Sequence, residues 1–395
     1  MKHRGVFIVL ATIVVLVIGA AGAVGWYITR ETPEPFEYDD VAIWAPNLGS
    51  QTVLLDVDDD GSLLVAFYDG GRSIDYEVTG AENIPVIVGQ QPGVAVVTPD
   101  GEPHVLSEPK PLADDVAGEA VGSIHRGSVA VAWQVRGVSV NGEGKLVFQA
   151  QEPTVAMAIG SADGLEPMPV PVRDGAPLSV QWGGLHVADG VLVALVMEVA
   201  QDSSFESMTG IIDLATGEFI ALDTGASLAP MRDLCDPNGG TFGYVATGAS
   251  GEPLEAHQFS VMQGEASGVR QLVPPETIAR AVPFNACGSD TAGVDRTSEA
   301  LVWTDGQEAA LSTAFVGSAA GDVFLAPEWA AVHGLSFGDF DRRVLVVDRE
   351  TKVVHTVSAN CDRLVASGDW IAFGYPEGDT CRPVAVPASA VLGRP

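Results

Sequence analysis

The chain has 395 residues, with 52 Asp and Glu against 20 Lys and Arg, so its formal net charge at pH 7 is −32. A field of that sign repels phosphate backbones and anionic headgroups, which argues against nucleic-acid binding. Such acidity suits solubility in an exposed or salty compartment; attraction of a basic partner or of divalent cations is the alternative.

The chain begins with a segment typical of a membrane anchor. Residues 5–29 carry no formal charge, follow Lys2 and Arg4, and precede Arg30. About 20 helical residues span a ~30 Å hydrocarbon layer, whereas the apolar part of a cleavable signal usually has roughly 7 to 15. The positive-inside bias then places the N-terminus in the cytoplasm and the rest of the chain outside. Cleavage near the small residues 21–23 is the alternative, and it would release the mature chain.

Composition divides the chain into three parts. We expect a transmembrane signal anchor over residues 1–30 and a stiff Pro/acidic linker over 31–40, which contains two prolines and five acidic residues. A folded domain is expected over 41–395. Its apolar runs are short, rich in Val, Ile, Leu and Ala, and separated by Gly, Asp, Asn and Pro. No convincing amphipathic helix of ordinary length interrupts them, so the sequence predicts an all-β domain.

The short apolar runs recur in one order: a short strand, a turn, a strongly apolar strand, a polar turn and a third strand. The pattern is clear at residues 185–222, 329–355 and 363–373, and weaker at 94–107, 123–148 and 291–311. Strand-rich units of roughly 40 to 50 residues over about 350 residues predict a β-propeller. We expect seven four-stranded blades, with six or eight as alternatives. Residues 41–44 are expected to complete the blade that contains 370–373, because an open ring leaves exposed edges.

One hairpin carries a family resemblance. The Asp213–Glu218 turn resembles the Asp-x-x-Thr-Gly hairpin of quinoprotein-like and YVTN-like propellers. The tryptophan that usually follows that turn in quinoprotein repeats is missing. The resemblance implies a propeller fold, and it implies neither a quinone cofactor nor a specific family.

All four cysteines lie in the C-terminal half of the chain, at Cys235, Cys287, Cys361 and Cys381. An oxidising compartment favours two disulfides, and no CxxC or Cys/His spacing suggests zinc. The first three cysteines are expected just before the innermost strands of their blades, and the last between the second and third strands of the final blade. All four would then share one face. The sequence therefore predicts Cys235–Cys287 between adjacent blades and Cys361–Cys381 within the last blade.

An acidic turn is the sharpest local motif. In the array Asp-x-Asp-x-Asp-Gly, Asp56, Asp58 and Asp60 are candidate calcium ligands. The array resembles the calcium loops of integrin-type propeller repeats and, less closely, the first half of an EF-hand. Phe67 replaces the EF-hand glutamate, and Leu64 replaces the ninth-position Asp of the integrin-type loop. An acidic type I′ hairpin turn explains the residues without metal and is the favoured interpretation.

Other chemical signals are weaker. His125, His186 and His333 each precede an apolar strand and would bind a transition metal if they met in the central channel; three separate turn or wall residues are the alternative. The sequence lacks a Gly-x-Ser-x-Gly elbow, a His-Glu-x-x-His motif and a phosphate-binding Gly-rich loop. A pair of carboxylates, as used in glycoside hydrolysis, cannot be recognised in this sequence, because some pair among its 52 acidic residues always looks suitable.

These features predict a single-pass, membrane-anchored propeller acting as a binding or scaffolding module at a bacterial cell envelope. No catalytic residue is assigned, and no cofactor beyond the calcium candidate. An envelope protein or a glycan is the expected partner. The alternatives are a polysaccharide hydrolase or lyase with carboxylates at the channel mouth, and an accessory subunit of a membrane complex.

Overall fold

The computed structural model describes residues 38, 40–76, 84–140, 146–148, 154–199, 205–222, 226–227, 230–247, 255–272, 284–295, 300–311, 319–335, 342–378 and 380–394. The chain divides into two compact units, Met1–Glu37 and Tyr38–Pro395, and the first lies wholly outside the described residues. The predicted anchor at 5–29 and nearly all of the linker therefore stay predictions. Within the described ranges, no helix combines the length and apolar character needed to cross a membrane.

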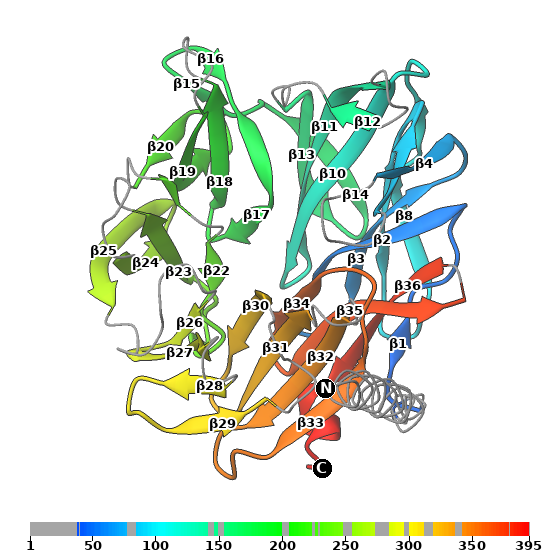
Figure 1. Cartoon of the computed structure of the whole chain (residues 1–395). Helices are drawn as coiled ribbons and strands as arrows, with labels where there is room; N and C mark the ends of the chain where they lie inside the picture. Colours follow the sequence, from blue (N-terminus) through cyan, green and yellow to red (C-terminus); the bar gives the residue numbers. More distant parts are fainter. Residues whose placement is uncertain are drawn as a thin grey trace, which may run out of the picture. The chain divides into compact units, whose positions relative to one another are not determined.

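The described residues of the second unit form a β-propeller of seven antiparallel blades, as the sequence predicted. Blade 1 consists of β2 (Gln51–Val57), β3 (Leu63–Tyr68), β7 (Gly93–Val97) and β8 (Pro103–Ser107). Blade 2 consists of β10 (Val116–His125), β11 (Ser128–Val140), β13 (Ala156–Ser161) and β14 (Gly164–Met168). Blade 3 consists of β17 (Ser179–Ala188), β18 (Val191–Val199), β19 (Phe205–Asp213) and β20 (Phe219–Ala221). The blades follow one another around a centre in chain order, each with its first strand innermost (Figure 1).

Blades 4 to 7 complete the ring. In blade 4, β21 (Ala226–Ser227) and β22 (Met231–Arg232) share the first position and are followed by β23 (Thr241–Thr247), β24 (Glu255–Met262) and β25 (Glu265–Leu272). Blade 5 consists of β26 (Phe284–Cys287), β27 (Asp290–Asp295), β28 (Ala300–Trp303) and β29 (Glu308–Ala310), and blade 6 of β30 (Ala319–Leu325), β31 (Trp329–Leu335), β32 (Arg342–Asp348) and β33 (Val354–Ala359). Blade 7 consists of β34 (Leu364–Ser367), β35 (Trp370–Glu377), β36 (Thr380–Pro387) and β1 (Ile43–Trp44).

The N-terminal strand closes the ring by joining the last blade, which confirms that prediction. β1 is the fourth strand of blade 7, and its Ile43 pairs with Ala385 and its Trp44 with Val384 of β36. The Arg382 side chain reinforces the joint by donating to the carbonyl of Ala45 at 2.9 Å. Residues more than 330 positions apart thus share one sheet, and the edge that an open ring would expose is covered.

Shorter elements extend this framework. Strands β4 (Arg72–Tyr76) and β5 (Ile84–Val88) pair with each other outside blade 1, and β5 also pairs with β10 of blade 2. The remaining short elements are β6 (Gln90–Gln91), β9 (Lys110–Pro111), β12 (Leu146–Phe148), β15 (Val172–Arg173), β16 (Ala176–Pro177) and the helix α2 (Ala388–Val391).

The core lies between blades. Across the described residues, apolar clusters fill the boundaries 1/2, 2/3, 3/4, 5/6 and 7/1. Trp303, for example, is 2% exposed between blades 5 and 6. Alternating strands of Val, Ile, Leu and Ala bury both faces of a blade in this way, because each neighbour supplies the second half of a core. The boundary of blades 4 and 5 instead carries a disulfide and a polar pocket.

Both predicted disulfides form, Cys235–Cys287 between blades 4 and 5 and Cys361–Cys381 within blade 7. The prediction that all four share a face was wrong. Cys235 follows the first strand of its blade and Cys287 ends the first strand of the next, whereas Cys361 precedes β34 and Cys381 is the second residue of β36. Because successive strands alternate in direction, the first pair lies at the opposite end of the strands from the second.

We call the end of the ring that carries the connections between first and second strands the inner-loop face. In blades 1, 2, 4 and 5 these connections are residues 58–62, 126–127, 233–240 and 288–289. The first strands of all blades run in the same direction along the axis of the ring, so these turns lie together at one end of the central channel. The candidate site residues gather there.

Candidate functional site

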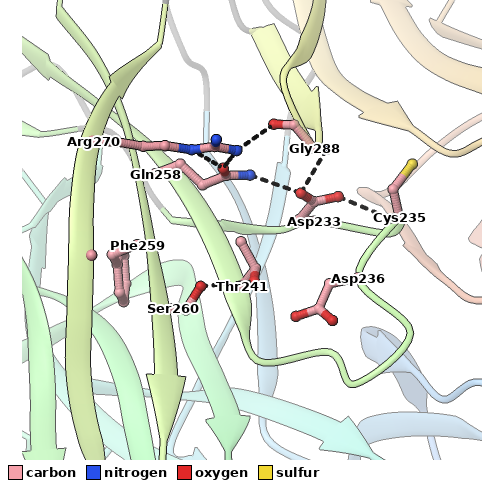
Figure 2. Close-up of a pocket in the computed structure, with 10 residues that line it drawn as sticks. Asp233, Cys235, Asp236, Thr241, Gln258, Phe259, Ser260, Arg270 and Gly288 are labelled. Carbon is pink, nitrogen blue, oxygen red and sulfur yellow. Dashed lines mark hydrogen bonds between the residues drawn. The ribbon is translucent and has the colours of Figure 1, made fainter.

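A pocket of about 280 Å³ opens at the inner-loop face between blades 4 and 5 (Figure 2). Its lining is mainly polar, with Phe259 as the large apolar side chain. It consists of Asp233, Cys235, Asp236, Thr241, Gln258, Phe259, Ser260, Gly268, Arg270 and Gly288. None of these residues except Cys235 was singled out from the sequence, because residues scattered between positions 233 and 288 show no motif spacing.

One wall of the pocket is a chain of hydrogen bonds. Arg270 donates through Nε to Oε1 of Gln258 at 2.8 Å, and through Nη2 to the carbonyl of Gly288 at 3.0 Å. Gln258 in turn donates to Asp233 at 2.7 Å. Asp233 also accepts the backbone N–H groups of Gly288 and Cys235, each at 2.8 Å. This wall spans blades 4 and 5 and is fixed by the adjoining disulfide.

The two carboxylates of the pocket differ in their ionisation. Burial raises the pKa of Asp233 above its ordinary value, although its hydrogen bonds oppose the shift. For Asp236, desolvation is outweighed by donors that include the N–H groups of Asn238 and Gly240 and the Thr241 hydroxyl, so its pKa is lowered. Asp236 is therefore the better anionic acceptor, and Asp233 mainly joins the two blades.

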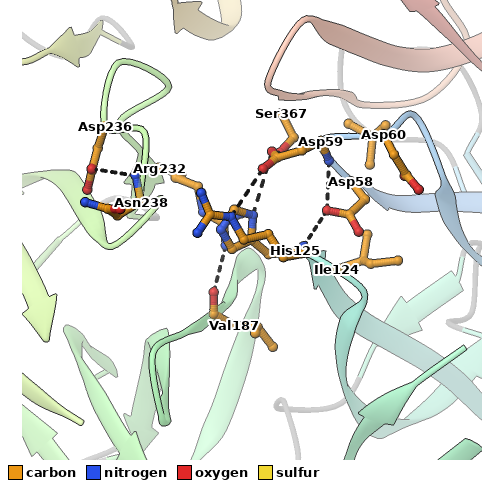
Figure 3. Close-up of polar contacts among 12 residues, drawn as sticks. Asp58, Asp59, Asp60, Ile124, His125, Val187, Arg232, Asp236, Asn238 and Ser367 are labelled. Atoms are coloured by element: carbon orange, nitrogen blue, oxygen red, sulfur yellow. Dashed lines mark hydrogen bonds and ion pairs between the residues drawn. The ribbon is translucent and has the colours of Figure 1, made fainter. Parts of the chain in front are cut away.

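A second polar cluster, at the mouth of the channel, joins four blades (Figure 3). The Asp59 carboxylate of blade 1 lies 3.8 Å from Nδ1 of His125 and 3.7 Å from Nε of Arg126, both from blade 2. It also accepts the hydroxyl of Ser367 from blade 7. Arg126 donates to the carbonyl of Pro237 in the 233–240 loop of blade 4. The loop that lines the pocket thus also contacts the channel mouth.

Asp58 is held by backbone donors from two blades. Its Oδ1 accepts the N–H groups of Asp59 at 2.8 Å and Arg126 at 2.6 Å, and its Oδ2 accepts that of Gly127 at 2.7 Å. Asp58 is only 3% exposed. These bonds make the carboxylate a clamp between the turns of blades 1 and 2.

Asp56 and Asp60, the other predicted calcium ligands, have separate sets of partners. Asp56 accepts the N–H groups of Val57 at 2.9 Å and Ile124 at 3.0 Å, and burial raises its pKa. Asp60 accepts the N–H of Ser62 at 2.9 Å. Among the described residues, Asp58 groups with Asp59 and His125 as potential metal ligands, within 4.8 Å of one another, rather than with Asp56 and Asp60. The calcium prediction itself stays untested.

Of the three predicted channel histidines, only two come from innermost strands. His125 ends β10 and His186 lies in β17, whereas His333 lies in β31, the second strand of blade 6, so the expected trio does not form. Desolvation, followed by the charge of Arg232, lowers the pKa of His125 to about 4 and that of His186 to about 3. Both imidazoles are neutral at physiological pH.

Arg232 is a buried cation inside the channel, 8% exposed, which sequence inspection missed. Its Nη2 donates to the carbonyl of Val187 in blade 3 at 2.7 Å, while its Nε has no hydrogen-bond partner among the described residues. Burial lowers its pKa, and the negative charges of Asp56, Asp59 and Asp58 oppose that shift. A single arginine at the end of a two-residue strand gives no sequence signal for such a position.

Comparison with solved structures finds chains of low identity. A structure from a study of two prolyl endopeptidases has a TM-score of 0.47 and 12% identity over 86% of this chain, which spans 47% of that chain. The β-propeller domain of the Trilobed protease from Pyrococcus furiosus, described as having an open velcro topology, gives 0.44 and 10% over 85% of this chain and 95% of its own. An oligogalacturonate lyase from Vibrio parahaemolyticus gives 0.42 and 12% over 87% and 91%. No family model and no curated protein matches the sequence.

Proposed function

We propose that this chain is a membrane-anchored, extracytoplasmic binding protein of a bacterial cell envelope. Its pocket between blades 4 and 5 would take a hydroxyl-rich ligand, such as a segment of an envelope glycan. The observation that supports this proposal is the pocket itself, about 280 Å³ in volume and lined by carboxylate, amide, guanidinium and hydroxyl groups.

The lining matches the chemistry of sugar hydroxyls, which both donate and accept hydrogen bonds. The oxygens of Asp236 accept the backbone N–H groups of Asn238 at 2.9 Å and Gly240 at 3.1 Å, and Thr241 is a further donor. The acceptor capacity that remains on this anionic carboxylate is available to a ligand. The hydroxyls of Thr241 and Ser260 lie 3.1 Å apart and can donate or accept. A ligand hydroxyl beside Asp236 and this hydroxyl pair would meet both acceptors and donors.

The walls of this pocket are fixed before any ligand arrives. The Cys235–Cys287 disulfide and the hydrogen bonds of Asp233 to Gly288 and Gln258 hold blades 4 and 5 in register. A preorganised site loses little conformational freedom on binding, so more of the interaction energy appears as affinity. This rigidity favours a binding role.

Two features support the proposed location. The charge-free segment at residues 5–29 is long enough to span a bilayer, and two disulfides suit an oxidising compartment outside the cytoplasm. Protease treatment of intact cells tests this directly. The folded domain should be cleaved or shed from intact cells, whereas protection until the cells are lysed would contradict the topology.

The binding proposal is tested by calorimetric titration of the full chain, purified in detergent, with a panel of envelope polysaccharide fragments. We expect saturable binding of at least one fragment, and Asp236→Asn should raise its Kd at least tenfold, about 1.4 kcal/mol. Asp163→Asn is the matched control, because that side chain is exposed and lies in blade 2 outside the pocket. Absence of binding across the panel, or equal affinity of Asp236→Asn and the native chain, would refute the proposal.

A polysaccharide hydrolase or lyase is the second candidate. It is favoured by one observation, that Asp233 has a raised and Asp236 a lowered pKa while both line one pocket. The three donors that already engage Asp233 favour binding over catalysis. Release of new reducing ends or unsaturated products from the same fragments, abolished by Asp236→Asn, would replace the binding proposal with the enzymatic one.

A further inference from the structure

We infer that the channel mouth is a site for one divalent transition-metal ion, bound by carboxylate oxygens of Asp58 and Asp59 and by Nδ1 of His125. This goes beyond the glycan pocket and does not depend on it. One potential ligand atom from each residue lies within 4.8 Å of the other two. Ligand atoms about 2 Å from a shared ion stand roughly 3 to 4 Å apart, so only small side-chain movements would close the site.

The buried imidazole of His125 is an independent sign of a missing partner. The residue is 7% exposed, and neither ring nitrogen makes a geometrically complete hydrogen bond within the described residues. The backbone of Asn238 is close enough to oppose, but not to cancel, the lowering of the pKa of His125. Buried polar atoms are nearly always paired, so an imidazole left in this way suggests an absent ligand. Nδ1 already points toward Asp59, 3.8 Å from its Oδ1.

The position of the ring is set by Gly239. A Cβ at Gly239 would lie 2.3 Å from Nε2 of His125, so a glycine is required for the imidazole to pack there. Nε2 is therefore covered by the backbone of blade 4, and Nδ1 is left for the carboxylates of blade 1.

Both carboxylates keep lone pairs for an ion while backbone and hydroxyl donors orient them. Within the described part of the chain, Oδ2 of Asp58 accepts the N–H of Gly127 and Oδ1 of Asp59 accepts the hydroxyl of Ser367, one hydrogen bond for each oxygen. Arg126 lies 3.7 Å from the other oxygen of Asp59, Oδ2. The donors would act as the outer shell that supports metal ligands in proteins.

The ligand set selects the class of ion. One neutral imidazole and two carboxylates suit Zn²⁺, Co²⁺ or Mn²⁺, whereas Ca²⁺ prefers six to eight oxygen ligands. Arg126 and Arg232 place positive charge beside the site, and the carboxylates of Asp56, Asp58 and Asp59 offset it. The site differs from the predicted Asp56, Asp58 and Asp60 array, because it requires Asp59 and His125 and excludes Asp60.

The test is titration of the metal-stripped full chain in detergent with Co²⁺, followed by its visible absorption. We expect one saturable site that Zn²⁺ displaces and excess Ca²⁺ does not. Asp59→Asn and His125→Ala should each raise the Kd at least tenfold. Asp60→Asn, in the same turn, and His104→Ala, in the outer strand β8, should leave it unchanged.

Asp59→Asn is expected to fold, because 39% of its side chain is exposed, and circular dichroism checks this. X-ray absorption of the native Co²⁺ complex requires no variant and should show one imidazole among nitrogen and oxygen ligands. The inference is overturned by any of four results: no saturable Co²⁺ binding, no imidazole in the complex, displacement by Ca²⁺, or equal losses in Asp60→Asn and Asp59→Asn.

Discussion

The carboxylate of Asp233 in blade 4 accepts a hydrogen bond from the backbone N–H of Gly288 in blade 5, at 2.8 Å. Five other blade boundaries are filled by apolar clusters among the described residues. At the 4/5 boundary a charged acceptor and the Cys235–Cys287 disulfide hold the blades together at the inner-loop face instead. Polar contacts at the inner-loop face leave space for a pocket there, which a close-packed apolar boundary does not.

Replacement of Asp233 should therefore destabilise the propeller. Asp233→Ala leaves three donors without an acceptor, from Cys235, Gly288 and Gln258, and should lower the free energy of unfolding by about 2 to 4 kcal/mol. Urea unfolding measures this loss. Asp305→Ala is the control, an exposed turn residue that accepts one backbone N–H, and should change stability by less than about 1 kcal/mol. Equal effects of the two substitutions would show that the hydrogen bonds of Asp233 stabilise the propeller no more than those of an exposed turn residue.

The two disulfides should contribute unequally to stability. They close loops of 52 and 20 residues, and the chain-entropy relation assigns about 4 kcal/mol to Cys235–Cys287 and about 3 kcal/mol to Cys361–Cys381. Double Cys→Ser variants of each pair, compared by thermal unfolding, measure the difference. If the blade 7 variant loses more stability than the 4/5 variant, loop length does not govern these crosslinks.

Gly61 lies where the turn of blade 1 meets blade 7, and it tolerates no side chain. Its φ is +90°, and a Cβ would lie 2.6 Å from Trp370 and 2.7 Å from Ile43. Gly101 has a φ of +82° with nothing within 4 Å, so it isolates the backbone effect. Gly101→Ala should cost about 1 kcal/mol, and Gly61→Ala about 1 to 3 kcal/mol more. Equal losses of unfolding free energy in urea would mean that Trp370 and Ile43 move aside from the added methyl group without a cost in stability.

Asp348 should make stability depend on pH in the acid range. Desolvation is outweighed by the N–H groups of Thr351 and Glu350 and by Arg394, whose Nη2 lies 2.7 Å from Oδ2, so the pKa of Asp348 is lowered. The unfolded chain then binds this proton more readily, and the stabilisation is present above the ordinary pKa and lost as pH falls through the folded value. Asp348→Asn should reduce stability clearly at pH 6 and little at pH 2. If the difference in unfolding free energy between the native chain and Asp348→Asn does not become smaller toward low pH, this assignment is wrong.

Sequence patterns located most strands because blade strands are local and strongly apolar. They failed at the first strands of blades 4 and 5, which are short: β22 has two residues and β26 has four. The second strands were therefore read as the first, and Cys235 and Cys287 were assigned to the wrong end of the blades. The same ambiguity placed His333 on an innermost strand, although it lies in β31.

The order of apolar runs and turns determined by itself that the domain beginning near residue 41 is a β-propeller closed by residues 41–44, because a blade can bury its faces only against like neighbours. The sites depend on tertiary structure. Asp59 meets His125 and Ser367 only when the turns of blades 1, 2 and 7 converge at one mouth, and Asp233 meets Gly288 only across a blade boundary. Side chains so far apart in the sequence have no periodic relation, so ring geometry alone decides which of them are neighbours.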